Sequence, residues 1–253
     1  MARNKAVRQV AMILKSFSRE SYNLGVSEFA STLNLPKSVV HEDLVALVEE
    51  GILEKDEKTS KYSLGVEIFH MGQLVHSQMI LRQCGLPIME NLSRITGETV
   101  ILAGLVKGSP CCIEKIPSSH DLSLSVDIGT WYPLHAGTVG KTLLAFQKEE
   151  ERNKIIEGLE LVRFTENTIM DKSELRKRLM EILERGYDLS IEERVKGVAS
   201  VGAPVKNHRG EAVAVLILGG PTVRFTTERI DQYISLVKEG AQEISKKMGS
   251  LSS

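Results

Sequence analysis

The sequence predicts an α+β fold in which a small, mostly helical module precedes a larger module of strands and helices. Its 253 residues exceed the usual length of one domain, so two domains are expected. Residues 5–51 carry apolar side chains at helical spacing, whereas β-prone segments alternate with helical ones beyond residue 98. A composition of 42% hydrophobic and 26% charged residues is typical of globular proteins.

The segment Leu35–Gly51 predicts the second of two helices joined by a tight turn. Its apolar residues recur on one helical face: Val40, Leu44, Leu47 and Val48. Pro36 suits the first turn and Gly51 the end. A shorter amphipathic segment precedes it, with Ser27 placed to cap its start and only Asn34–Leu35 left for the turn. This pattern predicts a helix-turn-helix, the element that enters the DNA major groove. An αα-hairpin packed in another core is the alternative.

The flanking segments predict a winged helix. Residues 5–17 have the apolar stripe of a first helix. The segments Ile52–Lys55 and Tyr62–Leu64 are β-prone and enclose a charged turn, so they predict a hairpin that forms the wing.

Helical spacing returns over Leu64–Leu81, which predicts a linker helix between the two modules. Gly85 and Pro87 are expected to end this helix, because glycine and proline disfavour helix interiors. The expected domains are residues 1–65 for the winged helix, 66–83 for the linker helix and 84–253 for the second domain.

The second module predicts an antiparallel sheet flanked by helices. Three strands are expected over Thr99–Val106, Cys111–Ile116 and Leu122–Ile128. Helices are expected at 88–96, ending at Gly97, and at 138–147, 149–158 and 172–185, with Asp171 capping the last. A hairpin of Gly197–Val205 and Glu211–Leu218 and a helix from Thr227 to about Met248 complete the chain. Glu211–Leu218 is almost entirely apolar, so it should be a central strand covered on both faces.

No apolar run reaches the 18–20 or so residues that span a membrane, and MARNKAVRQV lacks the apolar segment of a signal peptide. Three cysteines without a CxxC pair suit a reducing compartment. We therefore expect a cytoplasmic protein with no membrane partner.

Residues 137–142, GTVGKT, end like a phosphate-binding P-loop, but the motif needs glycine where His135 stands. The same glycines open a helix, whose unpaired N–H groups and positive dipole end suit a carboxylate. Tight packing around Gly137 and Gly140 is the structural alternative.

Metal and catalytic sites are not expected. Cys111 and Cys112 are adjacent on a strand and should point to opposite faces, one into the core and one near the surface, so they could not share a zinc ion with His120 or His135. Ser123, Asp127 and His135 supply triad residue types without a nucleophile elbow. Glu192 and Glu193 suit an ion-pair patch or a loop anchor. The expected protein is therefore not an enzyme and needs no cofactor.

Two long segments resemble those of one known family. GTWYPLHAGTVGKTLLAF, Gly129–Phe146, is similar to the loop and helix that mark the isocitrate-lyase-regulator (IclR-type) transcription factors. The block Arg185–Pro221 resembles their second characteristic segment. The resemblance covers nearly the whole chain. It implies a winged helix-turn-helix that reads double-stranded DNA, a GAF-like effector-binding domain, and a homodimer or dimer of dimers on a palindromic operator.

The resemblance also implies an effector pocket between the loop before the signature helix and the facing sheet. The corresponding residues are Tyr132, Gly137, Thr138 and Val139 on the loop side, Ser190, Ser200, Ile217 and Gly219 on the sheet side, and Leu124 on the earlier strand. On the sheet side, several members of the family carry an acid, a thiol or serines, whereas this chain has two serines, an aliphatic residue and a glycine. We therefore expect a roomier, less polar pocket than one for a two- or three-carbon keto acid, suited to an aromatic or longer organic acid.

The expected DNA-reading residues lie on the leading half of the second helix: Lys37, Ser38, Val39 and His41. Backbone contacts are expected from Arg3, Lys5 and Arg8 on one flank and from wing residues Lys58 and Lys61 on the other. Family members usually have Arg and Leu where this chain has Glu42 and Asp43. Residues 1–66 hold nine basic and nine acidic residues, so non-specific DNA affinity should be weak.

The expected function is a ligand-responsive transcriptional regulator whose carboxy-terminal pocket binds a small organic acid and modulates operator binding. The alternative is a small-molecule sensor with weakened DNA affinity that acts through protein partners. These residues do not distinguish repression from activation.

Overall fold

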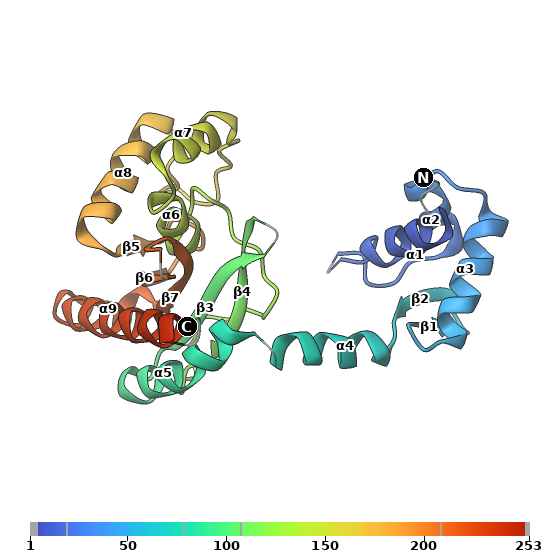
Figure 1. The fold of residues 1–253 in the computed structure, drawn as a ribbon, viewed down its shortest axis with the longest axis horizontal. Coiled ribbons are helices and arrows are strands. Elements are labelled where there is room, and N and C mark those ends of the chain that lie inside the picture. The colour runs from blue at the N-terminus through green and yellow to red at the C-terminus, as the bar shows by residue number, and fades with distance from the viewer. Residues whose placement is uncertain (1–4, 19, 78, 107, 208, 251–253) are drawn as a thin grey trace. The chain divides into compact units, whose positions relative to one another are not determined.

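The computed structural model describes residues 5–18, 20–77, 79–106, 108–207 and 209–250 (Figure 1). The chain divides into two compact units, Met1–Gln78 and Met79–Ser253. Within the described ranges, no helix is both long and apolar enough to cross a membrane.

The first unit is a winged helix-turn-helix followed by one further helix. Its elements are α1 (Lys5–Lys15), α2 (Val26–Leu33), α3 (Lys37–Glu49), β1 (Leu53–Asp56), β2 (Lys61–Leu64) and α4 (Val66–Ser77). β1 and β2 pair antiparallel as the predicted wing, with Leu53 opposite Leu64. The wing joins the helices through a two-residue bridge, in which Leu24 and Tyr62 exchange backbone hydrogen bonds of 3.0 and 2.8 Å.

The helix-turn-helix has its own core. Val40, Leu44 and Leu47 of α3 are buried against Phe29 of α2 and Ile13 of α1. This core lies wholly within the first unit, so the alternative of an αα-hairpin inside another core is wrong. The Gln9 amide also donates to Asp43 Oδ2 at 2.7 Å, which ties α1 to α3.

The capping of α2 differs from the prediction. Ser27 lies inside the helix, and the N-cap is Gly25, whose N–H donates to Glu28 Oε2 at 2.6 Å. The side chain of Glu28, the third residue of the helix, therefore caps the start of α2 instead of Ser27. The turn to α3 passes through Asn34 in the left-handed region (φ 53°), a conformation that asparagine tolerates.

The predicted linker helix is interrupted. α4 ends at Ser77, and α5 runs from Ile80 to Thr96, through both Gly85 and Pro87. The expectation that these two residues end a helix is wrong. Pro87 lies on the exposed side of α5, where water can solvate a carbonyl that loses its helical partner. Gly85 faces the sheet, and a Cβ there would lie 2.7 Å from Leu102 Cδ2, so close packing requires glycine.

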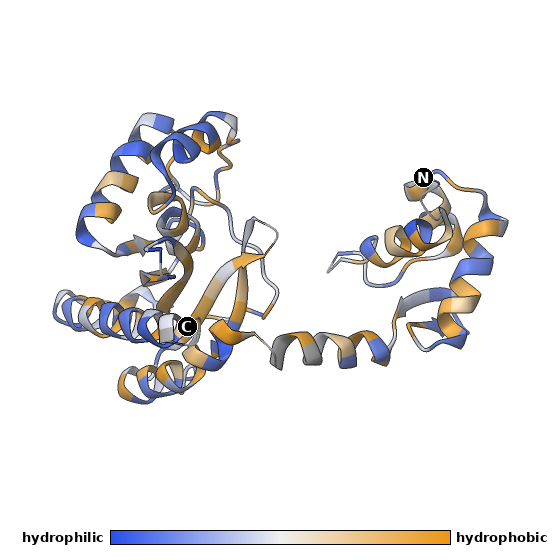
Figure 2. Cartoon of the chain, viewed as in Figure 1, coloured by the Kyte–Doolittle hydropathy of each residue, from blue (hydrophilic) through white to orange (hydrophobic). Residues whose placement is uncertain are grey.

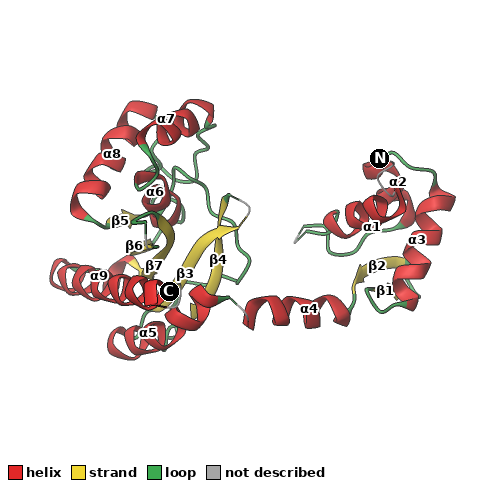
Figure 3. Ribbon diagram, in the orientation of Figure 1, coloured by secondary structure: helices red, strands yellow, loops and turns green. Residues whose placement is uncertain are grey.

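The second unit is a five-stranded antiparallel sheet flanked by helices (Figure 3), as predicted. The strands are β3 (Thr99–Val106), β4 (Ser109–Ile116), β5 (Asp188–Ile191), β6 (Val198–Lys206) and β7 (Ala212–Pro221), in the order β4-β3-β7-β6-β5. The helices after α5 are α6 (Thr138–Ala145), α7 (Glu149–Gly158), α8 (Lys172–Arg185) and α9 (Thr227–Ser250), with the short 3-10 helix η1 (Thr222–Arg224). β7 is central, as its apolar sequence predicted.

Alternate residues of each strand face opposite layers. On β3, Val100 and Leu102 pack with α5 and α9, whereas Ile101 and Ala103 pack with Val139 of α6. A third apolar cluster joins α6 to α7 and α8. Figure 2 shows hydrophobic and hydrophilic residues alternating along the covering helices, as expected for helices with one buried face.

One strand prediction was wrong, and one strand of the sheet was not predicted. Leu122–Ile128 forms no strand; the segment is anchored instead by a hydrogen bond from Thr99 Oγ1 to Leu124 O (3.1 Å). Its apolar residues cover the α6 side of the sheet without joining the ladder. The short strand β5 was not predicted, because DLSI has too few residues for a two-residue period to be recognised.

Candidate functional site

A cavity of about 70 Å³ lies between the α6 side of the sheet and the loops around it. It is lined by Ile101, Leu124, Val126, Tyr132, Gly137, Thr138, Val139, Ser190, Glu193, Arg194, Val195, Val198, Ser200 and Ile217. Ligand pockets usually span roughly 300–1,000 Å³. In this conformation the cavity therefore has room for only a few water molecules, and a longer or aromatic acid requires a larger volume.

The loop side of the cavity is the start of α6. Gly137 is the N-cap, with φ 79° and ψ 172°, a backbone conformation that is essentially restricted to glycine. Thr138 and Val139 form the first turn and carry no side-chain cap. One turn on, a Cβ on Gly140 would lie 2.0 Å from Pro133 O, so the loop before the helix packs directly on its backbone. The two glycines therefore have different roles: Gly137 begins the helix, and Gly140 permits close packing.

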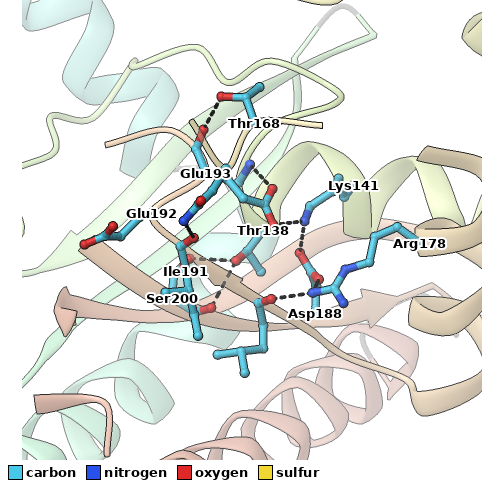
Figure 4. Close-up of polar contacts among 12 residues, drawn as sticks. Thr138, Lys141, Thr168, Arg178, Asp188, Ile191, Glu192, Glu193 and Ser200 are labelled. Atoms are coloured by element: carbon cyan, nitrogen blue, oxygen red, sulfur yellow. Dashed lines mark hydrogen bonds and ion pairs between the residues drawn. The ribbon is translucent and has the colours of Figure 1, made fainter. Parts of the chain in front are cut away.

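The sheet side brings together residues from β5, β6 and β7. Ser190 and Ser200 are paired across β5 and β6, and Ile217 projects from β7. Thr138 Oγ1 lies 2.6 Å from Ser200 Oγ, so α6 and β6 share a hydrogen bond at the cavity wall (Figure 4).

Eight of the nine residues expected in the pocket line this cavity, and Gly219 does not. Gly219 lies beneath Leu124 instead, where an added Cβ would come within 2.8 Å of Leu124 Cδ2. Its lack of a side chain makes room for the segment that covers the cavity.

Sequence reasoning missed two charged lining residues, Glu193 and Arg194. The sequence predicts Glu193 as an anchor or ion-pair residue outside the pocket, and no pattern marks Arg194. Arg194 lies beside the start of α6, since a Cβ on Gly137 would be 3.8 Å from Arg194 Cβ. Its guanidinium carbon is 4.7 Å from the centre of the Tyr132 ring, a cation–π contact. The unpredicted strand β5 sets the course of this loop, so the chain alone held no clear signal for it.

A row of alternating charges lies behind the cavity wall (Figure 4). Lys141 Nζ, fully buried, lies 2.5 Å from Glu193 Oε1 and 3.2 Å from Asp188 Oδ2. Asp188 Oδ1 in turn lies 2.9 Å from an Arg178 nitrogen. Burial raises the pKa of Asp188, and the neighbouring Lys141 and Arg178 oppose that shift. Two cations and two carboxylates thus balance one another within the fold.

The row excludes a phosphate-binding P-loop. Lys141 would have to reach a phosphate, but its ammonium group is held by two carboxylates at 0% exposure. Glu193 also accepts a hydrogen bond from Gly137 N–H at 3.1 Å, so it anchors the start of α6. Glu192, in the left-handed region (φ 56°), accepts from Gly197 N–H at 2.9 Å. The prediction that the adjacent glutamates act as an ion-pair patch and loop anchor is confirmed.

The two adjacent cysteines are both buried, Cys111 at 6% and Cys112 at 1% exposure, so the expectation that one would be near the surface is wrong. The loop at Gly129–Tyr132 covers the β4 edge, with Cys112 N–H donating to Thr130 O at 2.8 Å. Burial raises the pKa of the Cys112 thiol to about 12, so it is protonated at neutral pH. No group of three or more His, Cys, Asp or Glu side chains within the described ranges could hold a metal ion.

Two of the triad residue types, His135 and Asp127, contact other residues. His135 Nε2 lies 2.8 Å from Val162 O, and Asp127 pairs with Lys115 at 3.5 Å.

The residues expected to read DNA lie on one exposed part of the first unit. Lys37, Ser38, Val39 and His41 are exposed on the first turns of α3, while Val40 between them is buried. Glu42 is exposed, whereas Asp43 is partly buried against Gln9.

The expected backbone contacts differ in their surroundings. Arg8 and Lys58 are exposed, and Lys61 is part-buried and pairs with Glu28 at 3.5 Å. Arg3 lies outside the described residues. Lys5 begins α1, and its side chain is not described.

Comparison with known proteins identifies both units. A family model for the IclR helix-turn-helix domain matches residues 6–57, and one for the bacterial transcriptional regulator IclR C-terminal domain matches residues 73–246. The HTH-type transcriptional regulator KdgR of Escherichia coli is 32% identical over 251 residues, which cover 97% of this chain and 95% of KdgR.

Solved structures agree. The Thermotoga maritima IclR structure aligns with a TM-score of 0.75 at 29% identity, covering 97% of each chain. An IclR homolog from Microbacterium hydrocarbonoxydans, solved in complex with 4-hydroxybenzoate, shares the fold, with a TM-score of 0.82 at 23% identity over 96% of this chain and 99% of that one. The winged helix-turn-helix, the helix-flanked antiparallel sheet and both family matches establish that this chain belongs to the IclR family of bacterial transcriptional regulators.

Proposed function

We propose that this chain is a ligand-responsive, DNA-binding transcriptional regulator in the cytoplasm. One observation carries the proposal. A winged helix with an exposed leading turn on α3 and a unit with a lined cavity occur in one chain. The named relatives are transcriptional regulators, which favours this role over an enzymatic one.

DNA recognition is assigned to the exposed start of α3. Lys37, Ser38, Val39 and His41 would face base edges in the major groove. Arg3, Lys5, Arg8, Lys58 and Lys61 would contact phosphates, which position the reading head without reading sequence. Since the charges of residues 1–66 cancel, specific contacts must supply most of the affinity.

The cavity of the second unit is assigned to a small organic acid. The first-turn N–H groups of Thr138 and Val139, beyond the Gly137 N–H that Glu193 accepts from, suit a carboxylate, as do the hydroxyls of Thr138 and Ser200. Leu124, Val139 and Ile217 suit an apolar body. Leu124, Tyr132, Gly137, Thr138, Val139, Ser190, Ser200 and Ile217 would contact the effector, and Gly219 would act by making room for Leu124.

A homodimer, or a dimer of dimers, would bind a palindromic operator. The helix α4 carries large apolar residues that are about half exposed or more: Val66, Phe69, Met71 and Val75. Val66 and Phe69 lie on one side of α4 and Met71 and Val75 on the other. Burying such side chains against a second copy of the chain would be favourable, because it removes apolar surface from water. Two-fold symmetry then matches two half-sites about one or two helical turns apart.

Effector binding would act through the connection between the units. Occupancy of the cavity shifts α4, which changes the spacing of the two reading heads relative to the half-sites. For effector binding to change operator affinity, the acid must bind more tightly to the conformation with one spacing of the reading heads than to the conformation with the other.

A DNA-protection experiment on the gene's own upstream region tests the proposal. The full chain should protect a symmetric sequence, and a panel of organic acids that includes 4-hydroxybenzoate should contain one that alters protection. Absence of any sequence-specific protection would contradict it.

A second candidate function is a small-molecule sensor that acts through protein partners. The exposed acid Glu42 on α3 and the zero net charge of the head favour it. A gel shift that finds no specific DNA complex, together with an acid-dependent change in melting temperature, would support this candidate over the first.

A further inference from the structure

Arg194 is the cation of the cavity that the fold does not neutralise. Among the described residues its guanidinium has no ion-pair partner, and its contact is the face of Tyr132 at 4.7 Å. Guanidinium donors lie in the plane of the group, so stacking on a ring leaves the edge free to bind an anion. Arg194 Cβ also lies next to Gly137, which places the residue at the start of α6.

The other charges near the cavity cancel. Glu193, which lines the cavity, is paired with Lys141, and Lys141 also contacts Asp188. Asp188 pairs with Arg178, so the buried row contains equal numbers of cations and carboxylates. Arg194 remains as one unbalanced positive charge on the cavity wall.

The geometry points to Arg194 as the residue that selects a monocarboxylate, by binding one carboxylate edge-on while Glu193 repels a second. This inference rests on the proposed use of the cavity as the effector site. An acid with one carboxylate and an apolar body neutralises Arg194 and meets the aliphatic wall of Ile101, Val139 and Ile217.

A second carboxylate meets two obstacles. Glu193 already occupies the Gly137 N–H and the Lys141 ammonium, so the nearest donors are taken by a carboxylate of the protein itself. The rest of the wall is aliphatic, where an unpaired charge is disfavoured. An uncharged amide of the same shape loses the charge-assisted hydrogen bonds to Arg194.

Matched ligands test the inference on the full chain. Calorimetric titrations at pH 7 and constant ionic strength would compare acetate with malonate and acetamide, butyrate with succinate and butyramide, and benzoate with terephthalate and benzamide. Within at least one set, the monocarboxylate should bind about 10- to 100-fold more tightly than its dicarboxylate and its amide.

Two variants separate Arg194 from general charge effects. Arg194→Gln should abolish the preference for acid over amide, while Arg194→Lys retains part of it because the charge remains without the planar fork. Lys196→Gln removes the same charge from an exposed residue of the same loop outside the cavity lining, and should retain the full preference. Melting temperatures of the free proteins establish that each variant folds.

The outcomes are distinct from those of the proposed function. Three results would overturn the role of Arg194: unchanged acid binding by Arg194→Gln, a dicarboxylate that binds as tightly as its monocarboxylate in every set that binds, or no binding in any set. Arg194-dependent binding that leaves DNA protection unchanged would support this inference and contradict the regulatory function.

Discussion

Glu193 and Gly137 lie 56 residues apart in the chain and are joined by a hydrogen bond of 3.1 Å from the Gly137 N–H to Glu193 Oε2. The same carboxylate pairs with the buried Lys141 at 2.5 Å. The Glu193 side chain thus binds both the N-cap residue of α6 and the ammonium group of Lys141, about one turn into the helix. Glu193 and Gly137 both line the cavity. The shape of the candidate site therefore depends on the buried ion pairs that hold Glu193 in place.

Lys141→Met should destabilise the second unit by about 3–5 kcal/mol, because it leaves the carboxylates of Glu193 and Asp188 buried without their shared cation. Urea unfolding, followed by the fluorescence of Trp131, would measure the change. Lys154→Met alters an exposed lysine of α7 in the same way and should change stability by no more than about 0.5 kcal/mol. Equal effects of the two variants would mean that the buried ion pairs contribute nothing to the stability of the second unit.

Gly140→Ala should destabilise the second unit by about 1–3 kcal/mol, despite the higher helix propensity of alanine. The new methyl group would lie 2.0 Å from Pro133 O, so the loop that lines the cavity must move. Gly158→Ala at the end of α7 has nothing within 4 Å and is the matched control. A melting temperature for Gly140→Ala at or above that of the unmodified protein would contradict the close packing.

Glu28→Gln should destabilise the first unit at neutral pH and have less effect in acid. The hydrogen bond from Gly25 N–H lowers the pKa of Glu28 below its ordinary value of 4.5, and the charge of Lys61 adds to this shift. A carboxyl with a lowered pKa stabilises the fold above its ordinary pKa, and this contribution is lost as the pH falls through the lowered value.

Hydrogen exchange of α2 and the wing would therefore be faster in Glu28→Gln than in the unmodified protein at pH 7, and the difference would shrink near pH 4. Glu49→Gln, an exposed residue of α3, serves as the control. A difference that is the same at both pH values would show that the charge of Glu28 has no role.

Glu42→Arg should strengthen binding to random duplex DNA and steepen its salt dependence by about one phosphate contact. Glu42 is exposed on α3 next to His41, so the substitution replaces a charge that phosphate repels with one that it attracts. Fluorescence anisotropy at low salt would measure it. Glu160→Arg makes the same charge change on an exposed residue of the second unit and should have less effect on DNA affinity. Equal effects of the two variants would show that Glu42 does not face DNA.

Elements with long, unambiguous patterns were predictable from the sequence. The apolar residues of α3 fall on one helical face, so Val40, Leu44 and Leu47 are buried. The uniformly apolar β7 must be covered on both faces, so it lies in the centre of the sheet. The left-handed cap at Gly97 and the Asp171 cap, whose side chain accepts from Ser173 and Glu174 N–H, follow local rules and were also predicted. The family resemblance supplied the pocket residues that no periodicity could indicate.

Contacts between distant segments decided the rest. Whether Gly85 and Pro87 end a helix depends on Leu102 and on which side of α5 meets water, and whether Leu122–Ile128 joins the sheet depends on competition for the β4 edge. The sequence by itself determined two modules, most of their helices and strands, and the helix-turn-helix, because hydrophobic periodicity and capping act over a few residues. Only the tertiary structure decided that Glu193 neutralises Lys141 while Arg194 keeps its charge at the cavity wall, because ion pairing depends on distances between residues that the chain keeps far apart.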